Sequence, residues 1–244
     1  MKNAILLCAG SARRFFQDGE NQPKCLLALA EHETILDRLL QAVLSRGYHA
    51  LLGTGCGHEM VSVHLAQHEY SGVRCIFNPD YATTNSIVTL WELRDFVGDE
   101  TLLINGDLVI GDNAFDLFDE TSSPQILTKY LPKFDDDSYR VVFDKQQSVL
   151  RMGKELKDTP SSSCAAYTGI SRVGNAALFL REIEKLLQSG SNQTWPSTAY
   201  RNLISEIQVR AVDIGSSPFF DIDTPQEHEA ARLSLATSHS SLPL

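Results

Sequence analysis

The sequence lacks any apolar run long enough to cross a membrane, and its first apolar stretch, residues 4–8, is too short for a signal sequence. It also lacks an excess of positive charge. The formal net charge of -10 gives no general attraction to nucleic acid or to anionic lipid. The five cysteines have no paired metal spacing, and their odd number argues against a complete disulfide framework. These absences predict a cytoplasmic protein that neither binds nucleic acid nor inserts into a membrane.

Two common phosphate-binding motifs are missing as well. The sequence has no GxxxxGK[ST] motif, because Gly153-Lys154 lacks both the upstream glycine and the following hydroxyl residue. It has no GxGxxG fingerprint of a dinucleotide site either. The sequence therefore contains no motif that would indicate a P-loop kinase or a dinucleotide-dependent dehydrogenase. No fixed internal period recurs, which also sets aside a repeat architecture.

Short apolar strands alternate with amphipathic helices in the first part of the chain. Residues 4–8 are continuously apolar, as in a strand that is buried on both faces of a parallel sheet, and a helix is predicted over residues 34–46. Further strands are predicted at 50–53, 73–77 and 101–104, and further helices at 58–69 and about 84–96. This series predicts an α/β fold with a Rossmann-like, mixed but mainly parallel sheet and helices on both faces. Ligands of such sheets bind beyond the carboxyl ends of the strands.

The pattern changes after Pro124. Segments 126–131, 139–143 and 148–152 have the composition of antiparallel strands separated by turns. Helices at 176–188 and 198–206 and a strand at 208–214 follow. We expect a single domain over residues 1–236, in which residues 124–172 form a small antiparallel β insertion beside the ligand-binding edge of the sheet, and a flexible tail over residues 237–244.

A loop that suits a polyanion follows the first strand. Gly10 allows backbone N–H groups to approach a triphosphate closely, and Arg14 and Lys24 supply cations to offset charge on phosphoryl oxygens. A glycine loop with nearby basic residues is equally common as a solvated turn. The loop by itself therefore leaves both readings open.

Residues 7–27 resemble the signature AAGxGxR followed by PKxLL, which is found in sugar-phosphate and phosphocholine-type nucleotidyltransferases. The resemblance extends over about residues 1–231 and implies that family's modified Rossmann-like domain. It implies catalytic roles for Arg14 and Lys24. It also implies nucleotide binding by the loop positions Ala9, Gly10, Ser11 and Ala12. The chain departs from the signature at Ala12, where the family has glycine, and a methyl group restricts a backbone that often uses positive φ.

Carboxylates that could hold a metal follow two predicted extended segments. Asp107 comes after a buried strand and a glycine, and it resembles the family's metal-binding aspartate. Asp221 and Asp223 alternate on an extended segment, so both could approach a hard cation from the same side. Asp223 matches the family's second metal position better, although it could instead cap the helix that begins near Pro225. Mg²⁺ needs only one or two carboxylates, so Asp107 and Asp223 would suffice.

The resemblance implies in-line attack of an acceptor phosphate or phosphonate oxygen on the α-phosphorus of an NTP, with release of pyrophosphate. This nucleophile is already anionic and needs no catalytic base. A packing or solvated role is therefore expected for the scattered histidines, which are His49, His58, His64 and His68.

Residues 78–91 resemble the N-P-x-Y-x-x-T-N segment of cytidylyltransferases, which implies CTP as the nucleotide. The positions carried over are Asn78, Thr84, Asn85 and Ser86. Helix capping explains the same residue types, because Ser, Thr and Asn are preferred where a helix begins. The pattern therefore has a structural alternative as well as a functional one.

Signals for the acceptor are thinner. Lys154 lies where such enzymes often have a lysine, and Trp195 lies in a segment, residues 192–196, that resembles the aromatic lining of an acceptor pocket. Asp221 is assigned to the acceptor with them. A solvated lysine and a core tryptophan are the competing readings. Phosphocholine, 2-aminoethylphosphonate, an amino-acid-derived phosphate and a sugar or polyol phosphate all stay open, with amine-bearing acceptors preferred.

Two other functions stay open beside a CTP-dependent cytidylyltransferase. A sugar-1-phosphate nucleotidyltransferase that uses UTP or dTTP would keep the same loop and the same metal aspartates. A non-catalytic nucleotide-binding regulator gains support from Ala12 alone. A homodimer also stays open.

Overall fold

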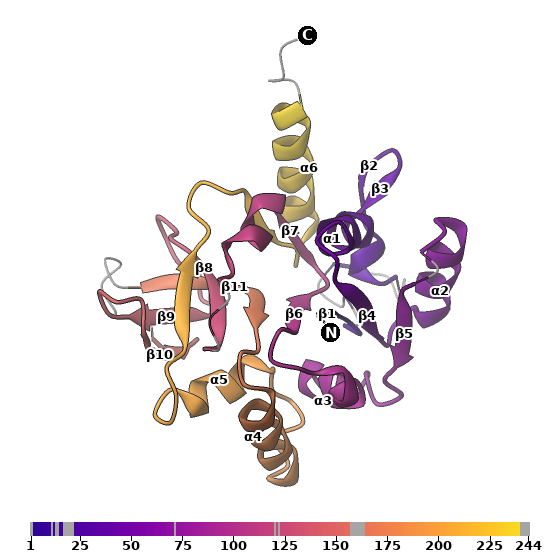
Figure 1. Ribbon diagram of the computed structural model, residues 1–244. Coiled ribbons are helices and arrows are strands. Elements are labelled where there is room, and N and C mark those ends of the chain that lie inside the picture. The colour runs from indigo at the N-terminus through magenta and orange to yellow at the C-terminus, as the bar shows by residue number, and fades with distance from the viewer. Residues whose placement is uncertain are drawn as a thin grey trace.

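The computed structural model describes residues 2–10, 12, 15–16, 22–70, 72–119, 121, 123–156 and 164–239. Its centre is a sheet that has nine strands in this part of the chain, with a main path in the order β10-β9-β11-β6-β1-β4-β5 (Figure 1). Strand β8 pairs with β11, and β12 pairs with β8. The predicted mixed, Rossmann-like sheet is thereby confirmed.

The parallel half of the sheet is built on β1 (Asn3–Cys8). Strands β4 (His49–Thr54) and β6 (Leu102–Asn105) flank it in parallel, and β5 (Arg74–Phe77) adds to β4. Along β1, Leu6 faces one hydrophobic core and Ile5 faces the other. The continuous apolar run of β1 therefore reflects burial on both faces, as predicted.

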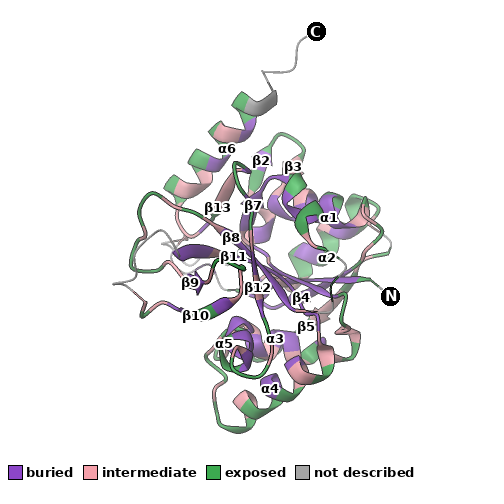
Figure 2. Cartoon of the chain, turned by 60° about the vertical axis from the view of Figure 1, so that its left-hand side comes forward, coloured by how far each residue is buried: buried purple, intermediate pink, exposed green. Residues whose placement is uncertain are grey.

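Helices cover both faces of the sheet (Figure 2). One face carries α1 (Ile35–Leu44) and α2 (His58–Gln67), and the other carries α3 (Ser86–Glu92), α4 (Ala176–Gln188) and α5 (Ser197–Leu203). The helix predicted at about 84–96 is shorter than expected, because a 3₁₀ turn, η2 (Arg94–Phe96), replaces its last part.

Helix α1 illustrates how local sequence sets an element's start. The Thr34 hydroxyl accepts a hydrogen bond from the backbone N–H of Asp37 at 3.1 Å, and the Asp37 carboxylate accepts one from the backbone N–H of Thr34 at 2.9 Å. This capping box satisfies donors that the first turn of a helix leaves unpaired. Gly47, with a φ of 76°, follows the helix end.

The antiparallel half is organised by β11 (Cys164–Arg172), a long buried strand that the sequence did not predict. It pairs with β6 through Ile170 and Ile104, and with β9 (Arg140–Phe143) through Cys164 and Val142. The other strands here are β8 (Gln125–Lys129), β10 (Val149–Gly153) and β12 (Arg210–Asp213). The strand expected at 126–131 is β8, and it lies between β11 and β12, parallel to the latter.

Two short strand pairs complete the framework. β2 (Ala28–Ala30) pairs with β3 (Glu33–Thr34), and β7 (Leu108–Ile110) pairs antiparallel with β13 (Phe219–Asp221). The 3₁₀ turns η1 (Lys24–Leu26) and η3 (Asp112–Leu117) lie in loops. Helix α6 (Pro225–His239) extends away from the body of the molecule (Figure 1). None of the helices in the described ranges combines the length and apolar character needed to cross a bilayer.

Candidate active site

A cavity of 410 Å³ lies where β6 ends, beside its antiparallel neighbour β11. Its floor includes Asn105 and Gly169, and its carboxylate rim includes Asp107, Asp221 and Asp223. The position agrees with the rule that ligands of α/β sheets bind beyond the carboxyl ends of the strands. The cavity is therefore the leading candidate for a substrate site.

The pairing of β7 with β13 brings the rim together. Asp221 lies opposite Leu108 in this ladder, and the backbone N–H of Ile222 donates to the carbonyl of Asp107 at 3.0 Å. Residues that are far apart in sequence are thereby fixed beside one another. The predicted convergence of Asp107, Asp221 and Asp223 is present in the structure.

Lys24 lies between two of these carboxylates. Its ammonium is 3.1 Å from Oδ2 of Asp107 and 2.5 Å from Oδ1 of Asp223. Burial by itself would lower the pKa of Lys24, but the two carboxylates outweigh it and the pKa is raised above its usual value. Lys24 is consequently charged and ties the loop after β1 to the segment before α6.

Gly57 packs closely against Pro23, the residue before Lys24. Its φ is 65°, and a Cβ there would lie 2.5 Å from Cδ of Pro23. Glycine therefore allows the turn before α2 to pack against the proline that precedes η1. This contact holds the start of η1, which carries Lys24.

The pKa of the Asp221 carboxyl is raised well above its usual range. Desolvation in the crowded wall of the cavity is the largest cause, and the neighbouring carboxylates of Asp107 and Asp223 add to it, although part of Asp221 still reaches solvent. Three carboxylates thus converge where one ammonium partly compensates them. These hard oxygen donors, arranged around a shared space, fit a divalent cation such as Mg²⁺.

Neighbours of Asp223 form the hydrogen bonds that cap the start of α6. The backbone N–H groups of Asp223 and Thr224 both donate to Oε2 of Glu227 at 2.8 Å, and the backbone N–H of Glu227 donates to the Thr224 hydroxyl at 3.3 Å. Thr224 and Glu227 therefore form the cap of α6. The side chain of Asp223 pairs with Lys24 instead.

The loop after β1 is described in part. A side chain at Gly10 would meet open space, so a ligand has room to approach the backbone there. Ala12 has a φ of 49°, which shows that the departure from the signature glycine falls on a left-handed residue. Ala9 accepts a backbone hydrogen bond from Cys56 at 3.3 Å. Ser11 and Arg14 lie outside the described residues, so their predicted roles stay predictions.

The residues predicted to read the base gather at the start of α3. Asn78 is buried, and its side-chain amide donates to the hydroxyl of Thr89 at 3.0 Å, while Thr84 donates to the carbonyl of Asp80 at 2.8 Å. Asn85 caps α3 by accepting from the backbone N–H of Ser86 at 2.7 Å. The cavity wall described above draws on other segments. Contacts between these four residues and a nucleotide stay a prediction.

The loop that bears these residues nevertheless approaches the loop after β1. A Cβ at Gly55 would lie 2.5 Å from the side chain of Tyr81 and 2.8 Å from the carbonyl oxygen of Ala9. The segment that begins with Asn78 and the loop after β1 therefore meet across Gly55.

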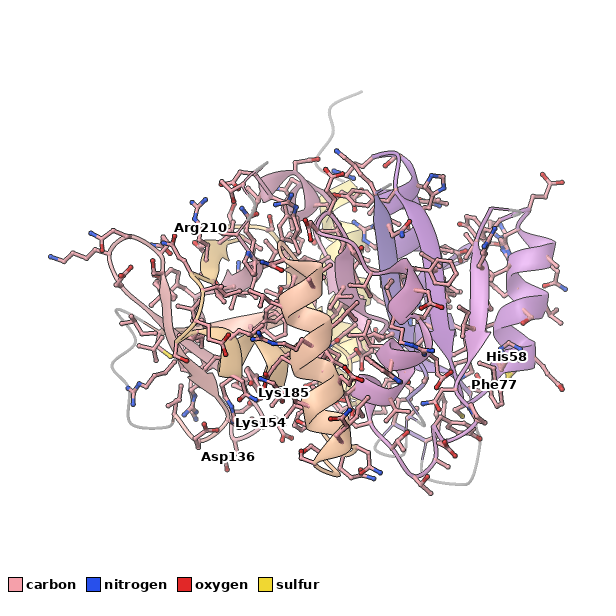
Figure 3. All side chains as sticks on the ribbon, turned by 60° about the horizontal axis from the view of Figure 1, so that its bottom comes forward. His58, Phe77, Asp136, Lys154, Lys185 and Arg210 are labelled. Atoms are coloured by element: carbon pink, nitrogen blue, oxygen red, sulfur yellow. The ribbon has the colours of Figure 1, made fainter. Side chains whose placement is uncertain are left out.

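Lys154 and Trp195 both line the cavity. The Lys154 ammonium lies 5.1 Å from the centre of the Trp195 ring and 3.2 Å from Oδ1 of Asp137. Figure 3 places Lys154 beside the acidic loop that carries Asp136. Trp195 is 41% exposed, which rules out a core position for it. Lys154 is held by an aromatic face and a carboxylate at the edge of the cavity.

Part of the cavity wall was not predicted as a site. Asp135, Asp137, Ser138 and Tyr139 line the cavity, although the run of three aspartates looked like a turn between strands. Tyr167 and Gly169 come from β11, the strand that the sequence missed. The three consecutive aspartates at 135–137 were a signal in the sequence that could have indicated a binding site.

Comparisons with known proteins extend this picture. No protein-family model matches the chain. The chain is 24% identical over 212 residues to the bifunctional protein GlmU of Methanocaldococcus jannaschii, a match that covers 87% of this chain and 49% of that protein. The chain thus spans about half the length of this curated relative.

Solved structures are similar over nearly the whole chain. CTP:phosphocholine cytidylyltransferase from Streptococcus pneumoniae superposes with a TM-score of 0.81 at 20% identity and covers 96% of this chain and 98% of its own. A UTP-bound UGPase from Acinetobacter baumannii gives a TM-score of 0.73 at 15% identity and covers 99% and 95%. These likenesses define the class: the chain has the nucleotidyltransferase fold. The resemblance that residues 7–27 carry is confirmed at the level of this fold.

Proposed function

We propose that the protein is a cytoplasmic nucleotidyltransferase that transfers a cytidylyl group from CTP to a small phosphorylated or phosphonate acceptor and releases pyrophosphate. One observation supports this most strongly: Asp107 and Asp223 converge on Lys24 at the rim of a 410 Å³ cavity. Carboxylates and a lysine at the end of a parallel strand suit a polyphosphate and its cation. The likeness to a CTP:phosphocholine cytidylyltransferase supports CTP as the nucleotide.

In the proposed reaction an oxygen of the acceptor's phosphate or phosphonate forms a bond to the α-phosphorus of CTP. The bond between that phosphorus and the oxygen that bridges to the β-phosphate breaks, and this electron pair leaves with pyrophosphate. The acceptor oxygen is anionic at neutral pH, so no proton has to be removed. The chemical burden on the protein is therefore positioning and charge compensation.

Asp107 and Asp223 would hold Mg²⁺, which supplies positive charge to the phosphate oxygens when it is bound. Lys24 then has to exchange its carboxylate partners for phosphate oxygens. Its raised pKa keeps the ammonium charged for that role. Gly10 leaves space for the triphosphate, and Arg14 would add a second cation.

The acceptor is proposed to bear an amine. The exposed face of Trp195 already has a cation 5.1 Å from the ring centre, namely the ammonium of Lys154. Asp135 and Asp137 line the same cavity and contribute negative charge. A substrate ammonium could occupy the position over Trp195, which would leave Lys154 to bind the acceptor's phosphate.

The test is pyrophosphate release in the presence of Mg²⁺, with CTP, UTP, ATP, GTP and dTTP each paired with phosphocholine, phosphoethanolamine, 2-aminoethylphosphonate and sugar phosphates. We expect release with CTP and an amine-bearing acceptor. Turnover with UTP or dTTP and a sugar phosphate would instead establish the alternative function. The absence of release from every pair, together with measurable binding of a nucleotide, would favour the regulator.

The sugar-1-phosphate alternative has an observation of its own. A UTP-bound UGPase shares the fold over 99% of this chain. The fold is therefore compatible with either reaction. The predicted metal aspartates and Lys24 would serve either reaction. The base-side segment that starts at Asn78 and the cavity around Trp195 would separate the two, so the nucleotide panel decides between them.

A further inference from the structure

A second cluster of metal-binding side chains lies between α1 and α2. Asp37 on α1, His64 on α2 and His68, the C-cap residue of α2, each place one ligand atom so that the three atoms lie within 4.8 Å of one another. The cavity described above is walled by other segments. Figure 3 shows His58, the first residue of α2, at the opposite end of the molecule from Lys154.

Asp37 is buried and has a fixed orientation. Its Oδ2 accepts from both the backbone N–H and the hydroxyl of Thr34, at 2.9 Å and 2.6 Å. Its Oδ1 faces α2 and accepts from Nε2 of His64 at 2.8 Å. The hydrogen bonds of the capping box hold Oδ2 and thereby fix the orientation of the carboxylate, with Oδ1 toward α2. Metal-binding carboxylates are commonly oriented by hydrogen bonds in this way.

His68 is set up to offer a lone pair. Its Nδ1 lies 2.9 Å from the carbonyl oxygen of His64. Because a carbonyl oxygen can only accept, Nδ1 carries the proton, and the lone pair of the neutral ring is on Nε2. Metal-binding histidines commonly donate their other ring N–H to a backbone carbonyl in this way.

The two imidazoles face each other one helical turn apart. Their ring centres are 4.1 Å apart and the ring planes are inclined by 26°. The His64 ring points toward α1, where its Nε2 lies 2.8 Å from Oδ1 of Asp37. His68 is exposed, so its side chain has room to shift toward the other two ligand atoms.

Helix α2 buries few apolar side chains. Its buried residues are Val61 and Leu65, whereas Met60 and Val63 are 42% and 55% exposed. Helix α1, in contrast, buries seven of its residues, including Ile35 and Leu36. A bond from α1 to α2 would therefore act where the apolar contacts of the helix are sparse.

We propose that Asp37, His64 and His68 bind a divalent transition cation of the Zn²⁺ type, which links α2 to α1. Two imidazole nitrogens and one carboxylate oxygen suit Zn²⁺ and leave a fourth, water-filled position. At ligand bonds of about 2.0–2.1 Å the ligand atoms would approach one another to roughly 3.4 Å. The cation takes the place of the His64 proton on Nε2, and the neutral ring then carries its proton on Nδ1. The site is chemically distinct from the all-oxygen rim at Asp107.

The test is calorimetric titration with Zn²⁺ of the Asp107→Asn/Asp223→Asn protein, in which the oxygen site is weakened. We expect one equivalent to bind and to raise the thermal unfolding temperature. His68→Gln in this background should weaken binding by more than about 10-fold, while its unfolding temperature without metal stays the same because the ring is exposed. His49→Gln, which changes another exposed histidine, is the matched control and should bind Zn²⁺ unchanged.

Co²⁺ gives an independent readout of the ligands. Its visible spectrum should show ligand-field bands without a thiolate-to-cobalt charge-transfer band, and these bands should disappear in His64→Gln/His68→Gln. A charge-transfer band would assign the metal to the cysteines and overturn the proposal. Equal Zn²⁺ affinity in the His68→Gln and His49→Gln variants, or no binding to the parent protein, would show a hydrogen-bonded helix contact only.

Discussion

The ammonium of Lys24 lies 2.5 Å from Oδ1 of Asp223, which joins the loop after the first strand to the segment before the last helix. The same ammonium contacts Asp107 at 3.1 Å. Lysine and a divalent cation would therefore compete for the same two carboxylates. The consequences of this competition can be measured separately from turnover.

Asp223→Asn should lower Mg²⁺-dependent pyrophosphate release by roughly 100-fold or more, because the substitution removes one of two proposed anionic ligands. Asp107→Asn should act similarly. The matched control is Asp213→Asn, which changes an exposed aspartate at the end of β12 and should keep the parent rate. Parent-like rates in both rim variants would refute the metal assignment.

Lys24→Gln should lower turnover and yet bind Mg²⁺ several-fold more tightly. The substitution removes the cation that competes for Asp107 and Asp223, and it also removes a proposed contact to the phosphates. Without Mg²⁺ the variant should unfold at a lower temperature, because Asp107, Asp221 and Asp223 then repel one another. Lys133→Gln, an exposed lysine, is the control. Weaker Mg²⁺ binding in Lys24→Gln would contradict the competition.

Trp195→Ala should raise the KM for an amine-bearing acceptor by about 5- to 30-fold, the equivalent of about 1–2 kcal/mol of cation–π attraction. Trp195→Phe should lose less, since the phenyl ring keeps an aromatic face. Steady-state kinetics would show the KM for CTP unchanged in both variants. An equal rise in both KM values would place Trp195 in a general packing role instead.

We expect the Asp119 carboxylate to add to the free energy of unfolding at neutral pH and to lose this contribution in acid. Desolvation opposes its charge, but hydrogen bonds from Thr121, Arg210 and Gln125 outweigh this and lower its pKa to about 2. A folded pKa below the unfolded value of about 3.9 means that the stabilisation is present above pH 4 and is lost as the pH falls toward 2. Because Asp119 is exposed, the effect should be modest.

Urea unfolding at a series of pH values between 5 and 2 measures this contribution. Asp119→Asn should reduce the fall in unfolding free energy across that interval. Asp95→Asn, which changes an exposed aspartate in η2, should leave the fall as it is in the parent. An identical pH dependence for Asp119→Asn and the parent would show that the carboxylate contributes nothing.

Local patterns predicted the elements whose cause is local. The apolar run of β1 and the helical spacing of the apolar residues of α1 are read directly from neighbouring positions in the sequence. Strand β11 was missed because Cys164–Arg172 mixes small, polar and aromatic residues without alternation, and its burial comes from partners on three other strands. Its strand character is therefore a tertiary effect.

The candidate site shows the same division. Asp107, Asp223 and Lys24 were found through short motifs, and the structure brings them together. The wall that contains Asp135 and Tyr139 depends on how loops fold over β11, which no local pattern encodes. Composition named Asn85 and Asp223 as possible caps, but only the structure shows that Asn85 caps α3 and that Thr224, with Glu227, caps α6 while Asp223 pairs with Lys24.

The antiparallel pairing of β7 with β13 also bears on the order in which the protein is built. Asp107 leaves the ribosome long before Asp221 and Asp223, so the parallel sheet can assemble while the rim is still incomplete. Contacts of such large sequence separation form late in folding because loop closure must precede them. A nascent chain that ends before β13 would thus hold a nearly finished scaffold in which Lys24 lacks its partner Asp223.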